Sequence, residues 1–170
     1  MNDLELLDLA YQSIKATLEK KEINTTPYET FKEKKGAFIT IKKKNILRGC
    51  IGVITTNQPL YITIRDMAIS AAFYDSRFRP LVKEEFKEIK ISISILSIPK
   101  KIEEVQEIKI GLHGVILKKG AYQAVFLPEV AIEQQWNLKQ FLEHLAVKAR
   151  LNKEDWKQAE LFIFSTKKLN

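Results

Sequence analysis

Apolar residues recur at helical spacing in three segments of the chain, which has 170 residues. The first segment, residues 3–21, carries a stripe whose members lie three, four and seven positions apart: Leu4, Leu7, Tyr11, Ile14 and Leu18. A second helix is predicted over residues 59–73, with Thr56 or Asn57 as its N-cap. The third helix begins after Asn137, another N-cap candidate, and its apolar face consists of Leu138, Phe141, Leu142, Leu145 and Ala149.

Strict alternation of apolar and polar residues marks the strands. Residues 89–95 read Ile, Lys, Ile, Ser, Ile, Ser, Ile, which is the period of a half-buried strand. Two pairs of β-branched runs predict hairpins, one joined by residues 42–45 and the other by Lys118–Lys119–Gly120. The four strands of these hairpins are expected over residues 37–41, 46–54, 114–117 and 122–127. A loop over 23–35, a short helix over 153–158 and a last strand over 160–165 complete the expected elements.

Helices and hairpins alternate here without the regular spacing of βαβ units. The predicted fold class is therefore α+β, with mainly antiparallel sheets flanked by helices and two lobes around a cleft. The length fits one domain, and no linker or low-complexity tract divides the chain. We therefore expect a single domain over residues 1–170.

Composition narrows the classes of function. The net charge is +7, yet only five of the 28 cations are arginine, so lysine dominates throughout the chain. Lysines scattered over a solvated surface produce a high pI without a nucleic-acid partner, because such binding needs charge clustered on one face. Four of the five arginines fall within residues 48–79, where a planar, bidentate donor is indicated. Nucleic-acid binding through the lysine-rich stretch 32–44 remains the less favoured alternative.

The same sequence argues against several compartments and cofactors. No run of 18 apolar residues occurs and the first residues are acidic, so we expect a cytoplasmic protein without a membrane span. A single cysteine, Cys50, excludes an internal disulfide and a multi-cysteine zinc site. Neither a metal-ligand spacing nor a phosphate-binding loop is present, and any cofactor is unknown.

The first candidate site is the hexapeptide Leu47-Arg48-Gly49-Cys50-Ile51-Gly52. Glycine weakens a strand, so Gly49 and Gly52 indicate a bulge or the close approach of another backbone or a ligand. On a regular strand Arg48 and Cys50 point to the same face, where a guanidinium would lower the thiol pKa and create a nucleophile. The alternative is a buried cysteine that packs as a small hydrophobe, and a bulge would separate the two side chains.

Three further positions carry candidate chemistry. The loop Asp75-Ser76-Arg77-Phe78-Arg79-Pro80 offers a carboxylate, a hydroxyl and two guanidiniums, or else a structural turn in which Asp75 and Arg77 satisfy each other. His113 precedes a strand, where it is a ligand contact or a hydrogen-bonded structural group. Glu129 follows a strand and is an acid or base if buried, or a plain surface residue.

The motifs LRGCIG, AFYDSRFRPL, ISISILSIP, GLHGVIL, LPEVAIEQQW and FLEHLAVKARL occur in this order. Together they resemble the AMMECR domain family, protein A of the AmmeMemoRadiSam system, over nearly the whole chain. Two departures are visible, Ser76 where the family usually has proline and Glu129 where glutamine is common. The resemblance implies a cytoplasmic α/β protein of two lobes, with the hexapeptide beside a cleft. It also implies Memo-like and radical-SAM proteins as partners, but no settled activity.

Two hypotheses follow, and whether the protein is an enzyme is open between them. In the first, Cys50 and Asp75 are catalytic, and a small anionic molecule is bound by Arg48, Gly49, Gly52, Arg77, His113 and Glu129. In the second, the protein is a non-enzymatic interaction module and the motifs are structural.

Overall fold

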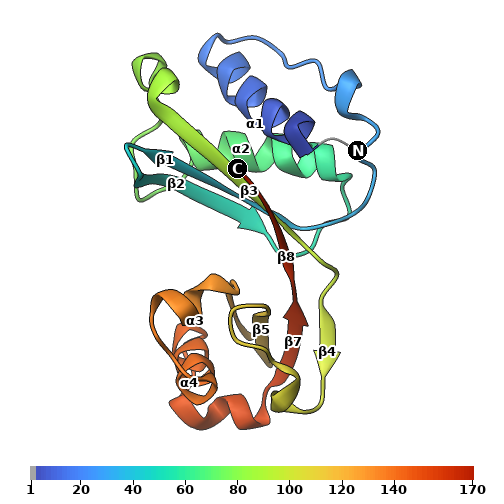
Figure 1. The fold of residues 1–170 in the computed structure, drawn as a ribbon, viewed down its shortest axis with the longest axis vertical. Coiled ribbons are helices and arrows are strands. Elements are labelled where there is room, and N and C mark those ends of the chain that lie inside the picture. The colour runs from blue at the N-terminus through green and yellow to red at the C-terminus, as the bar shows by residue number, and fades with distance from the viewer. Residues whose placement is uncertain (1–2) are drawn as a thin grey trace. The chain divides into compact units, whose positions relative to one another are not determined.

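The structure, a computed structural model, describes residues 3–170. The chain forms two compact units. The first unit contains Met1–Leu96 and Lys167–Asn170, and the second contains Ser97–Thr166. Figure 1 shows one sheet with helices in each unit.

The first unit is a four-stranded sheet with two helices on one face (Figure 1). The strand order is β2-β1-β3-β8, so β2 is an edge strand. The elements are α1 (Asp3–Leu18), η1 (Thr26–Tyr28), β1 (Ala37–Lys43), β2 (Ile46–Val53), α2 (Leu60–Phe73), η2 (Lys83–Glu88), β3 (Ile89–Leu96) and β8 (Thr166–Leu169). The helices α1 and α2 pack against each other, and α2 also packs on β1 and β2.

Buried and partly buried residues alternate along β1, and this alternation shows which face of the sheet the helices cover. Ala37, Ile39 and Ile41 are fully buried in the core beneath the helices. The intervening residues Phe38 and Thr40 are only partly buried, because successive side chains of a strand point to opposite faces. The isoleucines of β3 lie in register with those of β1, which extends the apolar face across both strands.

The second unit is a four-stranded antiparallel sheet in the order β4-β7-β5-β6. Its core joins Val115 and Leu117 of β5 to Phe141, Leu142 and Leu145 of α4. The elements are β4 (Lys100–Ile102), η3 (Val105–Glu107), β5 (Gly114–Lys119), β6 (Tyr122–Phe126), α3 (Glu129–Glu133), α4 (Leu138–Lys148), η4 (Lys153–Gln158) and β7 (Glu160–Phe164).

The predicted α+β class with antiparallel sheets and flanking helices is confirmed. Asn137 caps α4 as expected, since its side chain accepts a hydrogen bond from the backbone N–H of Gln140. The predicted N-cap of α2 is wrong: Pro59 holds that position, and the Thr56 hydroxyl instead accepts from the Gln58 N–H.

No helix within residues 3–170 combines the length and apolar character that crossing a bilayer requires. The single domain, the cleft and the cytoplasmic location stay predictions.

Two hairpin turns and part of the buried face of α1 differ from the expectation. The first hairpin turns at Lys44 and Asn45 alone, both with positive φ (50° and 64°), because a two-residue turn of this kind matches the twist of its strands. The second hairpin turns at Gly120 after β5 continues through Lys119. The apolar stripe predicted for α1 is confirmed at Leu7 and Ile14, which are buried, but Leu4 is 66 % exposed, and the buried face is wider than predicted because Leu6, Leu9 and Ala10 are buried beside the stripe.

Candidate functional site

Cys50 lies on the edge strand β2, opposite Thr40 of β1. Its Sγ is 3.3 Å from the Thr40 Oγ1, and the residue is partly exposed. Because Thr40 alternates with the buried Ile39 and Ile41, the thiol belongs to the face of the sheet opposite α1 and α2. The cysteine is therefore not packed in the helix-covered core.

The two glycines of the hexapeptide permit close packing on either side of Cys50. A Cβ at Gly49 would lie 2.1 Å from the backbone oxygen of Ala71 in α2, so only glycine fits beneath that helix. At Gly52 it would lie 2.3 Å from the ring of Phe38. The close approach of another backbone, one of the explanations expected for these glycines, is thus what Gly49 provides. A binding role for either glycine stays a prediction.

The loop after α2 fixes the backbone of Cys50. Asp75 Oδ2 accepts a hydrogen bond from the Cys50 N–H at 2.9 Å, and Arg77 Nη2 donates to the Cys50 carbonyl at 3.2 Å. The outward N–H and C=O of an edge strand have no strand partner, and here the two side chains take that place. The sequence alternative in which Asp75 and Arg77 satisfy each other and neighbouring backbone groups describes this geometry.

Asp75 and Arg77 are also joined directly. Arg77 Nε donates to Oδ1 at 2.9 Å and Nη2 donates to Oδ2 at 2.7 Å, a bidentate pair. The Arg77 backbone N–H donates to Oδ1 as well, at 3.2 Å, and Phe78 N–H closes the turn on the Asp75 carbonyl at 3.0 Å. The Asp75 carboxylate therefore receives four hydrogen bonds, which come from Cys50 and Arg77.

Burial and charge act in opposite directions on Asp75. The residue is 5 % exposed, and desolvation alone would raise its pKa. The Arg77 guanidinium, with smaller contributions from the backbone N–H groups of Cys50 and Arg77, instead holds the pKa of Asp75 well below its usual range. Asp75 is thus a permanent carboxylate at neutral pH. The Arg77 side chain remains 54 % exposed and lies over the ring of Phe78.

Arg48 does not lie beside the thiol. The register shifts between Ile41, which pairs with Gly49, and Lys42, which pairs with Leu47, so Arg48 is a bulged residue without a cross-strand partner. The regular strand assumed for Arg48 and Cys50 is therefore interrupted between them, and the bulge separates the two side chains.

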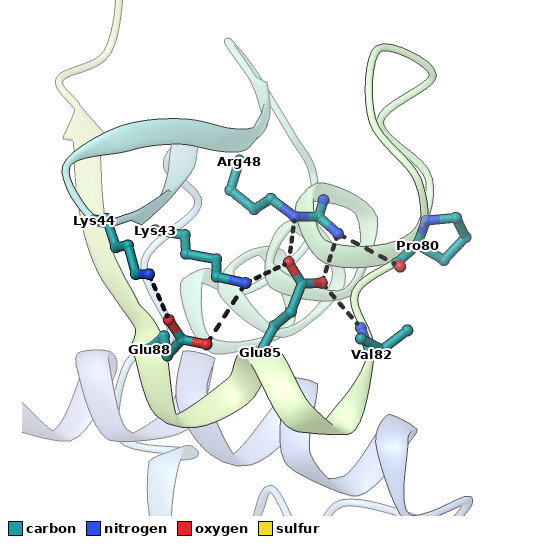
Figure 2. Close-up of polar contacts among 7 residues, drawn as sticks. All are labelled: Lys43, Lys44, Arg48, Pro80, Val82, Glu85 and Glu88. Atoms are coloured by element: carbon teal, nitrogen blue, oxygen red, sulfur yellow. Dashed lines mark hydrogen bonds and ion pairs between the residues drawn. The ribbon is translucent and has the colours of Figure 1, made fainter.

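The guanidinium of Arg48 binds Glu85 of η2 instead (Figure 2). Nε donates to Oε1 at 3.1 Å and Nη2 donates to Oε2 at 2.8 Å. Lys43 contacts the same carboxylate at 3.2 Å, and Lys43 and Lys44 both reach Glu88, at 3.6 and 3.8 Å. The hydrogen bonds from Arg48 lower the pKa of Glu85 from 4.5 to about 2. This ionic network joins the first hairpin to η2.

Glu85 and Thr40 were missed by the sequence reasoning. Glu85 stands among five charged residues in KEEFKE, and no periodicity separates it from its exposed neighbours. Thr40 had a usable signal, because it lies on the alternating face of a predicted hairpin whose other strand carries Cys50.

His113 and Glu129 lie in the second unit. His113 Nδ1 accepts from the backbone N–H of Lys109 at 3.2 Å in the turn before β5, so the hydrogen-bonded structural alternative describes its geometry. Glu129 is the first residue of α3 and is partly exposed. Within residues 3–170, no three His, Cys, Asp or Glu side chains are grouped so as to hold a metal ion. Roles for His113 and Glu129 in binding stay predictions.

The order of motifs, the two sheets and the hexapeptide define a member of one protein family. The AMMECR1 family profile matches residues 7–169, almost the whole chain. The chain belongs to the AMMECR1 family.

Relatives of similar length occur in archaea. Protein NEQ441 of Nanoarchaeum equitans is 38 % identical, covering 95 % of this chain and 96 % of its own. Protein MK0488 of Methanopyrus kandleri is 39 % identical, covering 94 % of this chain and 83 % of its own. The crystal structure of uncharacterized protein PH0010 from Pyrococcus horikoshii matches with a TM-score of 0.86 and 33 % identity, over 96 % of this chain and 88 % of that one. These names describe no activity.

Proposed function

We propose that this AMMECR1-family protein binds or transforms a small molecule at the thiol of Cys50. The supporting observation is that a partly exposed thiol is held on a strand whose outward backbone groups are fixed by an ion pair. A reactive group performs best when the residues around it hold it in one geometry.

In this proposal Asp75 is a positioning residue. Its carboxylate stays ionised and all its hydrogen bonds come from Arg77 and the Cys50 N–H, so it is poorly suited to donate a proton. Arg77 has a second role available, because its side chain is half exposed and can offer its two remaining N–H donors to an anionic group. Thr40 supplies a hydroxyl at the thiol itself. The site thus comprises Cys50, Thr40 and Arg77, with Asp75 behind them.

The second candidate is a non-enzymatic interaction module that acts with Memo-like and radical-SAM proteins in the cytoplasm. The observation that favours it is that Arg48, Asp75 and Glu85 are all engaged in internal ion pairs. Ion pairs of this kind can stabilise a protein-binding surface without taking part in a reaction.

Thiol labelling against pH separates the two candidates. A small-molecule site predicts that folded Cys50 reacts with a small alkylating reagent, and that a metabolite-sized ligand protects it. Cys50→Ser should abolish ligand binding while the unfolding midpoint changes little, since serine fits the same space. Ser97→Ala, a change in the second unit, is the control for nonspecific effects on binding.

Two results would reject the thiol site. One is a folded Cys50 that does not react at any pH between 6 and 9, combined with an empty ligand screen. The other is retention of ligand binding in Cys50→Ser. Co-purification with the Memo-like and radical-SAM proteins that survives Cys50→Ser would favour the interaction module.

A further inference from the structure

A pocket of about 310 Å³ in the first unit is lined by three lysines from three strands. Lys42 comes from β1, Lys90 from β3 and Lys168 from β8. Leu7 and Tyr11 of α1 also line it, and Ser92 contributes a hydroxyl. None of its lining residues is an aspartate or glutamate.

Two of the lysines are forced together by the sheet. Lys42 and Lys90 are direct partners in the β1–β3 register, so their side chains leave the same face of neighbouring strands. Like charges in directly opposite positions destabilise a sheet. Within the part of the chain that the structure describes, Lys42, Lys90 and Lys168 form no ion pair that would offset this repulsion.

The sequence neighbours of these lysines behave differently. Lys43 and Lys44 pair with Glu85 and Glu88 (Figure 2), and Lys167 pairs with Asp3 at 2.6 Å. Carboxylates are therefore available within one residue of Lys42 and of Lys168, yet none lies in the pocket. Lys43 and Lys167 are the strand neighbours of Lys42 and Lys168, and successive side chains of a strand point to opposite faces of the sheet, so these carboxylates lie away from the pocket lysines.

We infer that this pocket binds the phosphate group of a small phosphorylated molecule. A phosphate carries close to two negative charges at neutral pH and accepts several hydrogen bonds, which suits three ammonium groups beside a hydroxyl. The wall for the remainder of the molecule is preformed, since the Tyr11 hydroxyl accepts from the Ile91 N–H at 3.1 Å and holds the ring in place. The volume is at the lower end of ligand pockets, about 300–1,000 Å³, so the ligand is small.

The proposal is independent of the thiol. The pocket contains neither Cys50 nor Arg77, and its test does not depend on activity. The probes are inorganic phosphate, pyrophosphate and glycerol 3-phosphate, titrated at a fixed salt concentration and followed by ³¹P NMR and by the thermal unfolding midpoint. We expect glycerol 3-phosphate to bind and to raise the midpoint. Lys90→Gln and Lys168→Gln should each weaken binding about five- to tenfold, since each removes one charge-assisted hydrogen bond.

Lys32→Gln is the matched control. It removes the same charge from an exposed lysine of the first unit that lies outside the pocket, and its affinity should stay within about twofold of the parent. Lys90→Gln should also raise the unfolding midpoint in phosphate-free buffer, because it removes the repulsion with Lys42. That increase would support the pocket by a readout other than binding.

Three outcomes would overturn the inference. The first is that no phosphate probe binds. The second is an equal loss of affinity in Lys32→Gln and Lys90→Gln, which would mean that only net charge matters. The third is that a short single-stranded oligonucleotide binds far more tightly than the small probes with a steep salt dependence, which would make the lysines part of a nucleic-acid surface.

Discussion

Two arginine–carboxylate pairs contact the hexapeptide, and they are built differently. Arg77–Asp75 joins residues two apart in one loop, and its carboxylate side chain is 4 % exposed. Arg48–Glu85 joins residues 37 apart, and its carboxylate side chain is 17 % exposed. Both pairs are bidentate, and both lower the pKa of the carboxylate.

The two carboxylates differ in the further donors from which they accept hydrogen bonds. Asp75 also receives a backbone N–H from the edge strand, so losing it leaves a strand donor unpaired as well as an arginine. Glu85 instead receives Lys43 and the Val82 N–H of its own loop, so several donors share one acceptor and none of them is a backbone N–H of an edge strand. The comparison suggests that the Asp75 pair is essential to the local structure, whereas the Glu85 pair adds a smaller stabilisation.

The sharpest test of this difference is Asp75→Asn. The amide replaces one acceptor oxygen with a donor that faces the donors of Arg77 and Cys50, so we expect a loss of about 2–4 kcal/mol in the free energy of unfolding. Labelling of Cys50 should accelerate at the same time, because the edge strand loses its outward partner. Urea unfolding and thiol labelling measure the two effects.

Asp66→Asn is its control, since Asp66 also pairs with an arginine, Arg65, but is one-third exposed on α2. That change should cost less than about 0.5 kcal/mol, the usual range for an exposed pair. Equal losses in Asp75→Asn and Asp66→Asn would remove the distinction between the buried pair and ordinary surface pairs.

Glu85→Gln should have a smaller effect, about 1–2 kcal/mol at pH 7, because Arg48 loses its bidentate acceptor but no edge-strand N–H loses its partner. Glu84→Gln changes the exposed neighbour in the same 3₁₀ helix and should cost less than about 0.5 kcal/mol. A loss as large as that of Asp75→Asn would show that exposure does not distinguish the pairs.

The sequence allowed one of the two ion pairs to be predicted but not the other, and the reason is physical. Asp75 and Arg77 belong to one short loop, so their pairing was among the predicted alternatives. Arg48–Glu85 depends on a bulge, which changes the direction of one side chain by adding a residue to one strand. Gly49 and Gly52 indicated that the strand was irregular, but they did not show that the bulge lies at Arg48.

The secondary-structure elements show the same difference between features set by the local sequence and features set by distant neighbours. Strongly periodic segments such as residues 89–95 and the helix after Asn137 were predicted well, because their side-chain period is set by the local backbone. The strands β4 and β8 were missed, since KKI and TKKL are short and lysine-rich and become strands only through their neighbours in the sheets. Lys168, the pocket lysine of β8, was beyond reach for that reason.

Acid should remove the contribution of Glu85 before the fold is fully lost. Its pKa is lowered from 4.5 to about 2 in the folded protein, so its stabilisation is present above pH 4.5 and is lost as the pH falls through 2. The difference in unfolding free energy between the parent and Glu85→Gln should therefore fall to less than about half of its pH 7 value by pH 3. Urea titrations at several pH values test this, and a constant difference would contradict the lowered pKa.

The smallest expected effect is that of Arg48→Lys. Lysine keeps the charge but replaces the planar, two-point donor with a single ammonium, and Lys43 already contacts the same carboxylate. We expect a loss of about 0.5 kcal/mol in the free energy of unfolding. Lys44→Arg, a conservative change in the other direction at an exposed position of the same network, should change it by less than that. If Arg48→Lys costs as much as Glu85→Gln, the fork geometry of the guanidinium rather than its charge joins the bulge to η2, and the two pairs are alike in requiring arginine.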